Sequence, residues 1–184
     1  MSIESKAARI KLVLFDVDGV LTDGTVEVNG DGTESKRFCI RDGIAMVWAE
    51  REGLKVGLLS ARFSSTTTYR ASQLGLSVVR QGVANKLDAY DEIIADLKLA
   101  DADVAYMGDD VVDLAVLGRV GLSTAPSDAV PEVRRCVQWV APAAGGAGAA
   151  RALIEVILRA QNRWDALVAS FSAQRHPAPK VDQG

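Results

Sequence analysis

Histidine is almost absent from this sequence, and its scarcity limits the chemistry that the chain can perform. The single histidine, His176, lies in the polar stretch QRHPAPKVDQG near the end of the chain, where we expect a solvated side chain. Histidine-dependent catalytic triads, phosphorylated histidine intermediates and zinc sites with several histidines are therefore disfavoured. Catalysis is expected to rely on carboxylates, lysine, hydroxyl groups and a hard cation that prefers oxygen ligands.

Cysteines and long apolar runs are also scarce. Cys39 and Cys136 are far apart and form no Cys-x-x-Cys motif, so we expect two reduced thiols. No apolar run approaches the roughly 20 residues of a transmembrane helix. The opening segment MSIESKAARIK lacks the apolar region of a signal peptide. These features predict a cytoplasmic protein without a membrane partner.

A strong excess of charge of either sign is missing as well. The net charge is −3, and no basic stripe indicates nucleic acid as a partner. Apolar residues make up 48 % of the 184 residues, enough for one domain with a sizeable core. We expect a single domain over residues 1–171, followed by a flexible polar tail over residues 172–184.

Short apolar runs alternate with longer segments of helical periodicity. Strands are predicted at residues 10–15, 55–60, 78–79, 104–107, 121–124 and 138–140. Helices are predicted at residues 43–52, 64–74, 87–97, 111–117, 131–135 and 149–159. Such alternation predicts an α/β fold of the Rossmann-like, three-layer type, in which helices cover both faces of a parallel sheet.

Two stretches interrupt this alternation. In TVEVNGDGTESKRF, residues 25–38, Val26 and Val28 alternate with polar residues before a run of Asn, Gly and Asp, which predicts a β-hairpin inserted after the first strand. The Gly/Ala-rich stretch APAAGGAGAAR, residues 141–151, is expected to form a flexible lip beside the last helix.

Polar side chains follow the predicted strands at the points where those strands end. The stretch LFDVDGVLTDG places two aspartates directly after the first strand, and SAR and GDD follow two others. In a parallel α/β sheet, ligands bind beyond the carboxyl ends of the strands. The candidate site residues are Asp16, Asp18, Ser60, Ala61, Arg62, Lys86, Asp109, Asp110 and Asp113.

Carboxylates from two strands repel each other at one edge of a sheet unless a cation joins them. Oxygen ligands favour Mg²⁺, so Asp16 and Asp109 are expected to hold this metal. One carboxylate can attack phosphorus, and another can protonate the leaving oxygen and later activate water. The metal, Lys86 and Ser60 would offset the charge of a transferring phosphoryl group.

FDVDGVLTDG, LLSAR, the lone Lys86 and GDDVVD, in this order, resemble the four motifs of the haloacid dehalogenase superfamily. The resemblance implies that Asp16 is the nucleophile, that Asp18 is the acid/base, and that Ser60 and Lys86 bind phosphate. An acid two residues after the nucleophile is the pattern of the phosphatases of that superfamily.

The same resemblance implies a Mg²⁺ site. Its ligands would be the carboxylates of Asp16 and Asp109 and the backbone carbonyl of Asp18, with Asp110 or Asp113 in support. Structural alternatives remain for some of these residues. Asp113 can serve as a helix-terminal charge, Ser60 as a helix cap, and Lys86 as an ordinary surface lysine.

Further segments, FCIRDGIAM, QGVANK, VGLSTAPSDA and GGAGAAR, are similar to those of 3-deoxy-D-manno-octulosonate 8-phosphate phosphatases. This resemblance implies a domain without a cap that hydrolyses the phosphorylated sugar acid through an aspartyl-phosphate. It also implies a homotetramer assembled through the hairpins, in which a neighbouring subunit helps to close each site. Related families act on sialic-type 9-phosphates, so that substrate, a broader range of sugar phosphates, and an assembly-only domain without activity stay as alternatives.

One departure from the family pattern concerns the end of the Gly/Ala stretch. The family usually has an acid after the arginine, whereas Ala152 follows Arg151 here. A sugar acid substrate carries a carboxylate, which arginine binds well. Arg62 is the main candidate for this contact, with Arg41 and Arg151 as weaker ones, and a surface salt bridge is the alternative for each.

Overall fold

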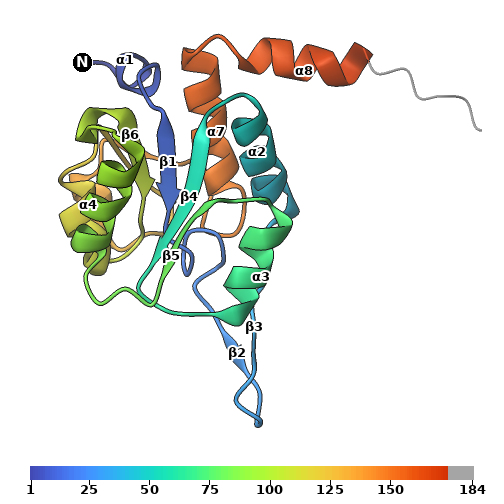
Figure 1. The fold of residues 1–184 in the computed structure, drawn as a ribbon, viewed down its shortest axis with the longest axis vertical. Coiled ribbons are helices and arrows are strands. Elements are labelled where there is room, and N and C mark those ends of the chain that lie inside the picture. The colour runs from blue at the N-terminus through green and yellow to red at the C-terminus, as the bar shows by residue number, and fades with distance from the viewer. Residues whose placement is uncertain (174–184) are drawn as a thin grey trace, which may run out of the picture.

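A six-stranded parallel sheet forms the centre of the molecule. The computed structural model describes residues 1–173, so His176 and most of the predicted tail lie outside the described residues. The strand order is β5-β4-β1-β6-β7-β8, and each neighbouring pair is parallel (Figure 1). The strands of this sheet are β1 (Leu12–Phe15), β4 (Lys55–Ser60), β5 (Val78–Gln81), β6 (Val104–Met107), β7 (Leu122–Ala125) and β8 (Trp139–Val140).

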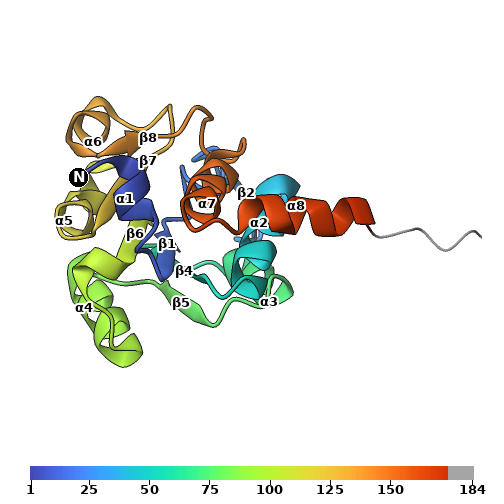
Figure 2. The ribbon, with the colours of Figure 1, turned by 90° about the horizontal axis from the view of Figure 1, so that it is seen from above.

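Helices cover both faces of this sheet, as Figure 2 shows from above. One face packs against α2 (Ile40–Arg51), α3 (Ser65–Gln73) and α7 (Ala149–Ala160), and the other against α4 (Lys86–Leu97), α5 (Leu114–Leu117) and α6 (Pro131–Cys136). The predicted three-layer α/β fold is therefore confirmed.

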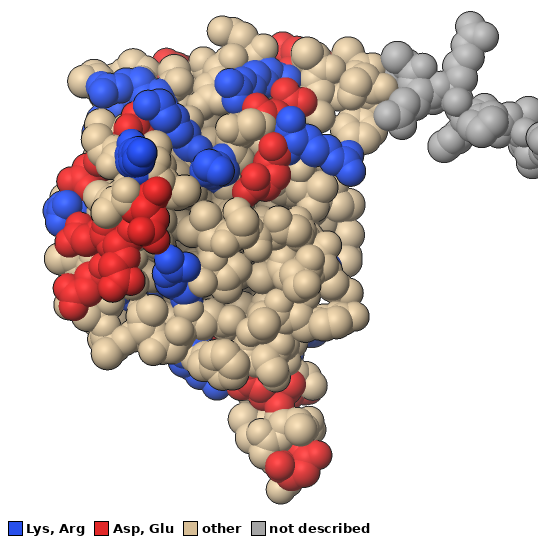
Figure 3. Space-filling model, in the orientation of Figure 1, with Lys and Arg blue, Asp and Glu red and all other residues tan. Residues whose placement is uncertain are grey.

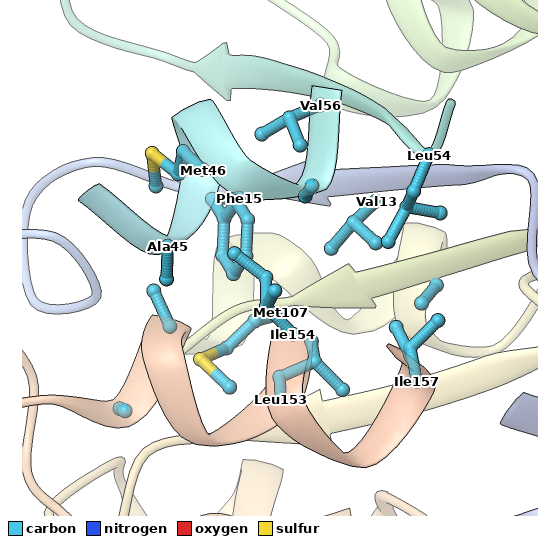
Figure 4. Close-up of a cluster of buried hydrophobic side chains, with 14 of the residues drawn as sticks. Val13, Phe15, Ala45, Met46, Leu54, Val56, Met107, Leu153, Ile154 and Ile157 are labelled. Carbon is cyan, nitrogen blue, oxygen red and sulfur yellow. The ribbon is translucent and has the colours of Figure 1, made fainter. Parts of the chain in front are cut away.

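The alternation of side chains along β1 explains the two hydrophobic cores. Val13 and Phe15 point into the core beneath α2 and α7 (Figure 4), whereas Leu12 and Leu14 belong to the core beneath α4. Successive side chains of a strand point to opposite faces, so a strand buried on both sides needs a continuous apolar run. Burial of each such side chain contributes roughly 1.5–3 kcal/mol relative to exposure.

Most predicted elements lie within a few residues of the observed ones. The strands predicted at 55–60 and 104–107 have the observed bounds, while the helix predicted at 111–117 divides into a 3₁₀ turn, Val111–Asp113, and α5. A second 3₁₀ turn spans Asp101–Asp103.

Two helices were not predicted. The first, α1 (Ile3–Ala7), is a five-residue helix capped by Ser2, too short to give a periodic pattern. The second, α8 (Trp164–Ala173), extends past the predicted start of the tail at residue 172. Its residues Trp164 and Leu167 are buried against the hydrophobic core. Its stability depends on these tertiary contacts, which the sequence pattern does not reveal.

Strands β2 (Glu27–Val28) and β3 (Glu34–Ser35) pair antiparallel in a separate two-stranded ladder. Figure 1 shows this ladder projecting from the end of the molecule toward which the β1 arrow points. It therefore begins close to the carboxyl edge of the main sheet, where ligands bind in folds of this type.

The Gly/Ala stretch is packed rather than free, which corrects its interpretation as a flexible lip. The Gly146 amide donates to the Val20 carbonyl at 3.0 Å, and a Cβ on Gly145 would collide with the backbone of Gly19. The buried carboxylate of Asp42 accepts the Arg151 amide at 2.8 Å and so caps the start of α7. Glycine serves here in two ways: Gly145 lets two backbones approach closely, and Gly146 and Gly148 adopt positive φ values of 63° and 115°.

Charged side chains of both signs share the surface. Figure 3 shows acidic side chains gathered over α4, with lysines and arginines above them. Within residues 1–173, every helix is too short or too polar to cross a lipid bilayer. In the same range, Cys39 and Cys136 are free cysteines.

Candidate active site

A pocket of about 280 Å³ lies at the carboxyl edge of the main sheet. Of the nine candidate residues that follow the strands or open the helix after them, it brings together all except Asp113, which lies buried next to it. Gly24 and Val112 also line the pocket and were not predicted. The lining residues are Asp16, Asp18, Gly24, Ser60, Ala61, Arg62, Lys86, Asp109, Asp110 and Val112.

Asp16 directly follows β1, and its amide donates to the Met107 carbonyl at 3.0 Å, which extends the ladder to β6. Its Oδ1 lies 3.0 Å from Nζ of Lys86. Burial raises the pKa of Asp16 to about 6, with Lys86 opposing this shift and the Asp113 carboxylate adding to it. The carboxylate is thus nearly out of water and fixed at one oxygen, a suitable arrangement for a nucleophile.

Lys86 is the first residue of α4, after the N-cap Asn85. Its side chain is only 4 % exposed, which excludes the alternative of an ordinary surface lysine. Burial alone would lower the pKa of Lys86, but the carboxylates of Asp16 and Asp113 outweigh it and raise the pKa. The ammonium therefore keeps its charge beside the pocket.

Asp113 holds the segment that follows β6. One oxygen accepts from Lys86 Nζ at 2.6 Å and from the Tyr106 hydroxyl at 2.6 Å. The other accepts from the amides of Asp109 at 2.9 Å and Asp110 at 3.2 Å. Both oxygens are engaged by protein donors, so Asp113 supports the neighbouring acidic residues through the backbone and through Lys86. Tyr106 was not predicted, because its position in the apolar run VAYM gives no polar signal.

Asp109 has the features of a metal ligand that lacks a protein partner. Its buried Oδ1 accepts no hydrogen bond from the described residues. Burial and the neighbouring carboxylates of Asp16 and Asp113 raise the pKa of Asp109 to about 8, against the opposing effect of Lys86. Three carboxylates therefore share one ammonium, and a divalent cation would offset the remaining negative charge.

Gly19 makes room for this carboxylate. Its φ is +89°, and a Cβ at this position would overlap the carboxylate of Asp109. Thr22, buried beneath the same turn, accepts the amides of Gly19 at 3.3 Å and Gly24 at 3.2 Å. Thr22 therefore shapes the turn, and the exposed Asp23 carboxylate nearby accepts the Thr25 amide at 3.0 Å.

Asp18 lies opposite the Asp16–Lys86 pair and contacts two cations. Its Oδ1 is 2.7 Å from Nζ of Lys36, and its Oδ2 is 3.4 Å from Nη1 of Arg62. Glu34 in turn holds Arg62, with 2.8 Å between Oε2 and Nη2. Sequence reasoning missed Glu34 and Lys36 at this site.

The remaining candidates divide between the pocket and other parts of the molecule. Ser60 is buried at the end of β4, and Ser64, not Ser60, caps α3. Arg41 is exposed on α2, and neither it nor Arg151 lines the pocket.

The arginine of the Gly/Ala stretch makes a different set of contacts from those expected. Arg151 pairs with Glu155 at 2.7 Å and lies over the rings of Trp48 and Trp164 at 5.2 and 5.7 Å. The hypothesis that Arg151 binds a substrate carboxylate therefore finds no support in this geometry. Glu155, one helical turn later on α7, is the acidic partner of Arg151.

Comparisons with known proteins agree with this geometry. A family model described as haloacid dehalogenase-like hydrolase matches residues 54–153. The chain is 37 % identical, over 88 % of its length and 86 % of the relative's, to the 3-deoxy-D-manno-octulosonate 8-phosphate phosphatase of Escherichia coli (strain K12).

Solved structures of phosphatases with the same name are also similar to this chain. The Moraxella catarrhalis 3-deoxy-D-manno-octulosonate 8-phosphate phosphatase, solved with magnesium, phosphate and KDO, has a TM-score of 0.90 and 35 % identity and covers 92 % of this chain and 97 % of its own. The Yersinia pestis phosphatase has a TM-score of 0.87 and 36 % identity, covering 89 % and 88 %.

Proposed function

The chain belongs to the haloacid dehalogenase-like hydrolases, and from this we propose a magnesium-dependent phosphatase acting on 3-deoxy-D-manno-octulosonate 8-phosphate. The products are the free sugar acid, a component of lipopolysaccharide biosynthesis, and inorganic phosphate. The observation that carries the proposal is the convergence of two aspartates from one turn, a buried lysine, a serine and an unpartnered aspartate on one pocket.

The cofactor is Mg²⁺, and the donor set suits it. The carboxylates of Asp16 and Asp109 and the backbone carbonyl of Asp18 would hold the ion, which explains why a buried oxygen of Asp109 lacks a protein donor. When bound, the ion offsets negative charge on the phosphoryl group. Asp113 contributes indirectly, by fixing the backbone that carries Asp109.

In the first chemical step, the Asp16 carboxylate attacks phosphorus. Lys86 holds Oδ1 of Asp16, which leaves Oδ2 for the attack. As the new bond between Asp16 and phosphorus forms, the bond from phosphorus to the sugar oxygen breaks, and Asp18 gives its proton to that oxygen. Lys86 and Ser60 contact the phosphoryl oxygens during transfer.

In the second step, water hydrolyses the aspartyl-phosphate. Asp18, now a carboxylate, takes a proton from the water as the water oxygen attacks phosphorus. The bond between phosphorus and Asp16 breaks, inorganic phosphate leaves, and both aspartates return to their starting states. Over the cycle, one water is consumed for each phosphate ester cleaved.

Arg62 is the proposed contact for the carboxylate of the sugar acid. It lies at the pocket rim with its side chain 50 % exposed, so a ligand can reach it. A guanidinium binds a carboxylate with two parallel hydrogen bonds, which favours acidic sugars over neutral ones.

A cytoplasmic homotetramer is the proposed form of the protein. Large apolar side chains are exposed on the hairpin and close to the pocket: Val28, Phe63, Val111 and Val112. Exposed apolar side chains that gather around one opening are typical of a surface that a partner covers. Gel filtration tests this form: Val28→Lys should shift the protein to smaller species, and a tetramer that persists would remove the hairpin from the interface.

Phosphate release with Mg²⁺ tests the function. The purified protein is compared on 3-deoxy-D-manno-octulosonate 8-phosphate, a sialic-type 9-phosphate and simple hexose phosphates. We expect the highest kcat/KM for the first. Preference for the 9-phosphate would assign the protein to nonulosonate synthesis, and equal slow turnover would indicate a broad sugar phosphatase. Absence of turnover would support the assembly-only alternative.

A further inference from the structure

The hairpin contributes two charged side chains that contact residues lining the pocket. Glu34 and Lys36 are two residues apart, and extended backbone places such residues on the same side. Both reach Asp18 or its partner Arg62: Lys36 contacts Asp18 directly, and Glu34 contacts Arg62. These contacts connect segments 18 and 28 residues apart in the chain.

The ammonium of Lys36 is buried to a degree that lysine rarely shows. Its side chain is 1 % exposed. Its described partners are Asp18 Oδ1 at 2.7 Å, Thr67 Oγ1 at 3.5 Å and Glu34 Oε1 at 4.0 Å. A buried cation is costly unless it is paired at short distance. Among the described carboxylates, only that of Asp18 lies within 3 Å of the Lys36 ammonium, so Asp18 is the partner that offsets the cost of burying this cation.

The two oxygens of Asp18 are held from two sides. Lys36 contacts Oδ1 at 2.7 Å, and Arg62 contacts Oδ2 at the longer distance of 3.4 Å. Arg62 is half exposed and is shared with Glu34, whereas Lys36 is enclosed. Arg62 donates a hydrogen bond to Oδ2, whereas the contact of Lys36 with Oδ1 is an ion pair without the alignment of a hydrogen bond. The Lys36 contact is still the shorter and the more enclosed of the two contacts to the Asp18 carboxyl group.

We infer that Lys36 is a positioning residue: from the hairpin, it holds Asp18 in the orientation from which a proton passes to the leaving sugar oxygen. This inference rests on the proposed function, in which Asp18 is the acid/base. It assigns the hairpin a role within its own subunit's site, besides any role in assembly.

The inference predicts a dependence on the leaving group that a structural role would not produce. An alkyl phosphate such as the sugar acid phosphate needs a proton on its leaving oxygen, whereas p-nitrophenyl phosphate releases a stable phenolate without one. Misplacement of Asp18 should therefore slow transfer of the phosphoryl group to Asp16 far more for the first substrate than for the second, whereas the later hydrolysis of the aspartyl-phosphate is the same for both.

The experiment compares Lys36→Met with the unaltered protein on both substrates. If Lys36→Met does not fold, Lys36→Gln takes its place. The rate compared is that of the first step, measured as release of the leaving group in a single turnover, because the second step uses Asp18 for both substrates. We expect this rate to fall about 10- to 100-fold for the sugar acid phosphate, part of the 10²–10⁴ that a general acid supplies, with KM changed less than about threefold. For p-nitrophenyl phosphate the fall in the first-step rate should stay under about threefold. Lys36→Arg, which keeps the cation, should recover part of the loss.

A matched control and a double variant complete the test. Lys11→Met removes a 65 % exposed lysine that pairs with Asp103 at 3.1 Å outside the pocket, and should leave both rates unchanged. Combining Lys36→Met with Asp18→Asn should add no more than about twofold to the loss from Asp18→Asn, because both act through one group.

Equal slowing of the first step for both substrates, a change in KM alone, or additive losses in the double variant would overturn the inference. Failure of the proposed function has a different outcome. In that case the unaltered protein hydrolyses neither substrate. If only the Lys36 inference fails, the protein is an active phosphatase, and substitution of Lys36 changes the rates for the two leaving groups by the same factor.

Discussion

The two sides of the pocket are built in different ways. The floor consists of Asp16, Lys86, Asp109 and Asp113, which follow or support strands of the main sheet. The wall consists of Asp18 and Arg62, which line the pocket from a turn and from the segment after β4, together with Glu34 and Lys36 of the hairpin, which contact these two side chains. The fold positions the floor directly, whereas the wall depends on contacts between side chains of segments that do not share a sheet.

Burial differs between the floor and the rim of the wall and determines how strongly their charges interact. Lys86 is 4 % exposed beside a fully buried Asp113, and Lys36 in the wall is equally enclosed, while Arg62 at the rim is half exposed. Charges in water are screened, and exposed pairs contribute little, whereas loss of one member of a buried pair is severe. Substitutions of the buried charges should therefore affect chemistry or stability, and those of Arg62 chiefly selectivity.

The largest effect is expected for the floor nucleophile. Asp16→Asn keeps the shape of the side chain but removes the carboxylate that attacks phosphorus, so kcat should fall by roughly 10⁴-fold or more. Phosphate release on the preferred substrate measures it, with the melting temperature confirming that the variant folds. Hydrolysis at a rate close to that of the unaltered protein would show that another residue is the nucleophile.

Asp113→Asn tests whether the floor is also a stability element. The substitution leaves the buried Lys86 ammonium with one carboxylate fewer, so the free energy of unfolding should fall by about 3 kcal/mol. The kcat should fall roughly 100-fold, because Lys86 and the Asp109 backbone lose their support.

Urea unfolding measures this loss of stability, with Asp103→Asn as the matched control. Asp103 pairs with Lys11, which is 65 % exposed, and accepts the Ala100 amide at 3.1 Å, a bond that the asparagine oxygen can keep. Loss of this solvent-screened pair should lower the free energy of unfolding by about 1 kcal/mol or less. Equal losses for the two variants would contradict the contrast between buried and exposed pairs.

Magnesium should stabilise the floor in a pH-dependent way. The folded protein holds the pKa of Asp16 at about 6 and that of Asp109 at about 8, above their unfolded values. Between about pH 4 and pH 8 the metal-free folded state thus binds more protons than the unfolded state, so its stability falls as pH rises. Mg²⁺ competes with these protons and binds better at the higher pH.

Thermal unfolding at about pH 5 and about pH 8, with and without Mg²⁺, measures this coupling. At roughly one hundred times its Kd, Mg²⁺ should raise the melting temperature by roughly 5–10 °C at the higher pH and by less at the lower. Asp109→Asn should remove most of the increase. An increase in melting temperature of the same size at both pH values would show that Asp16 and Asp109 do not bind the metal.

The same contrast explains what the sequence could and could not predict. The floor residues follow apolar strands or open a helix, and the carboxyl ends of parallel strands meet at one edge, so Asp16, Lys86 and Asp109 could be placed together without a structure. Lys36 lies in a stretch whose pattern predicts only a hairpin. Its spacing of two from Glu34 indicates a shared side, but nothing in the sequence shows that this side faces Asp18.

Two further differences have a similar cause. Arg151 was a candidate for substrate binding because arginine suits carboxylates, yet its guanidinium packs over Trp48 and Trp164. Helix α8, which carries Trp164, was not predicted, so the alternative partner for Arg151 could not be foreseen. Where a side chain's role depends on an element held by tertiary contacts, the local pattern is insufficient.

The smallest effect is expected at the rim of the wall. Arg62→Lys keeps the charge but loses the paired geometry for a carboxylate, so KM for the sugar acid phosphate should rise about three- to tenfold while kcat changes less than about twofold. Hexose phosphates, which lack the carboxylate, should show no change in KM, and this makes them the internal control. Because Arg62 is half exposed, its contribution should weaken as salt is added. A rise in KM of equal size for neutral and acidic sugars would mean that Arg62 orders the wall through Asp18 and Glu34 and does not read the substrate carboxylate.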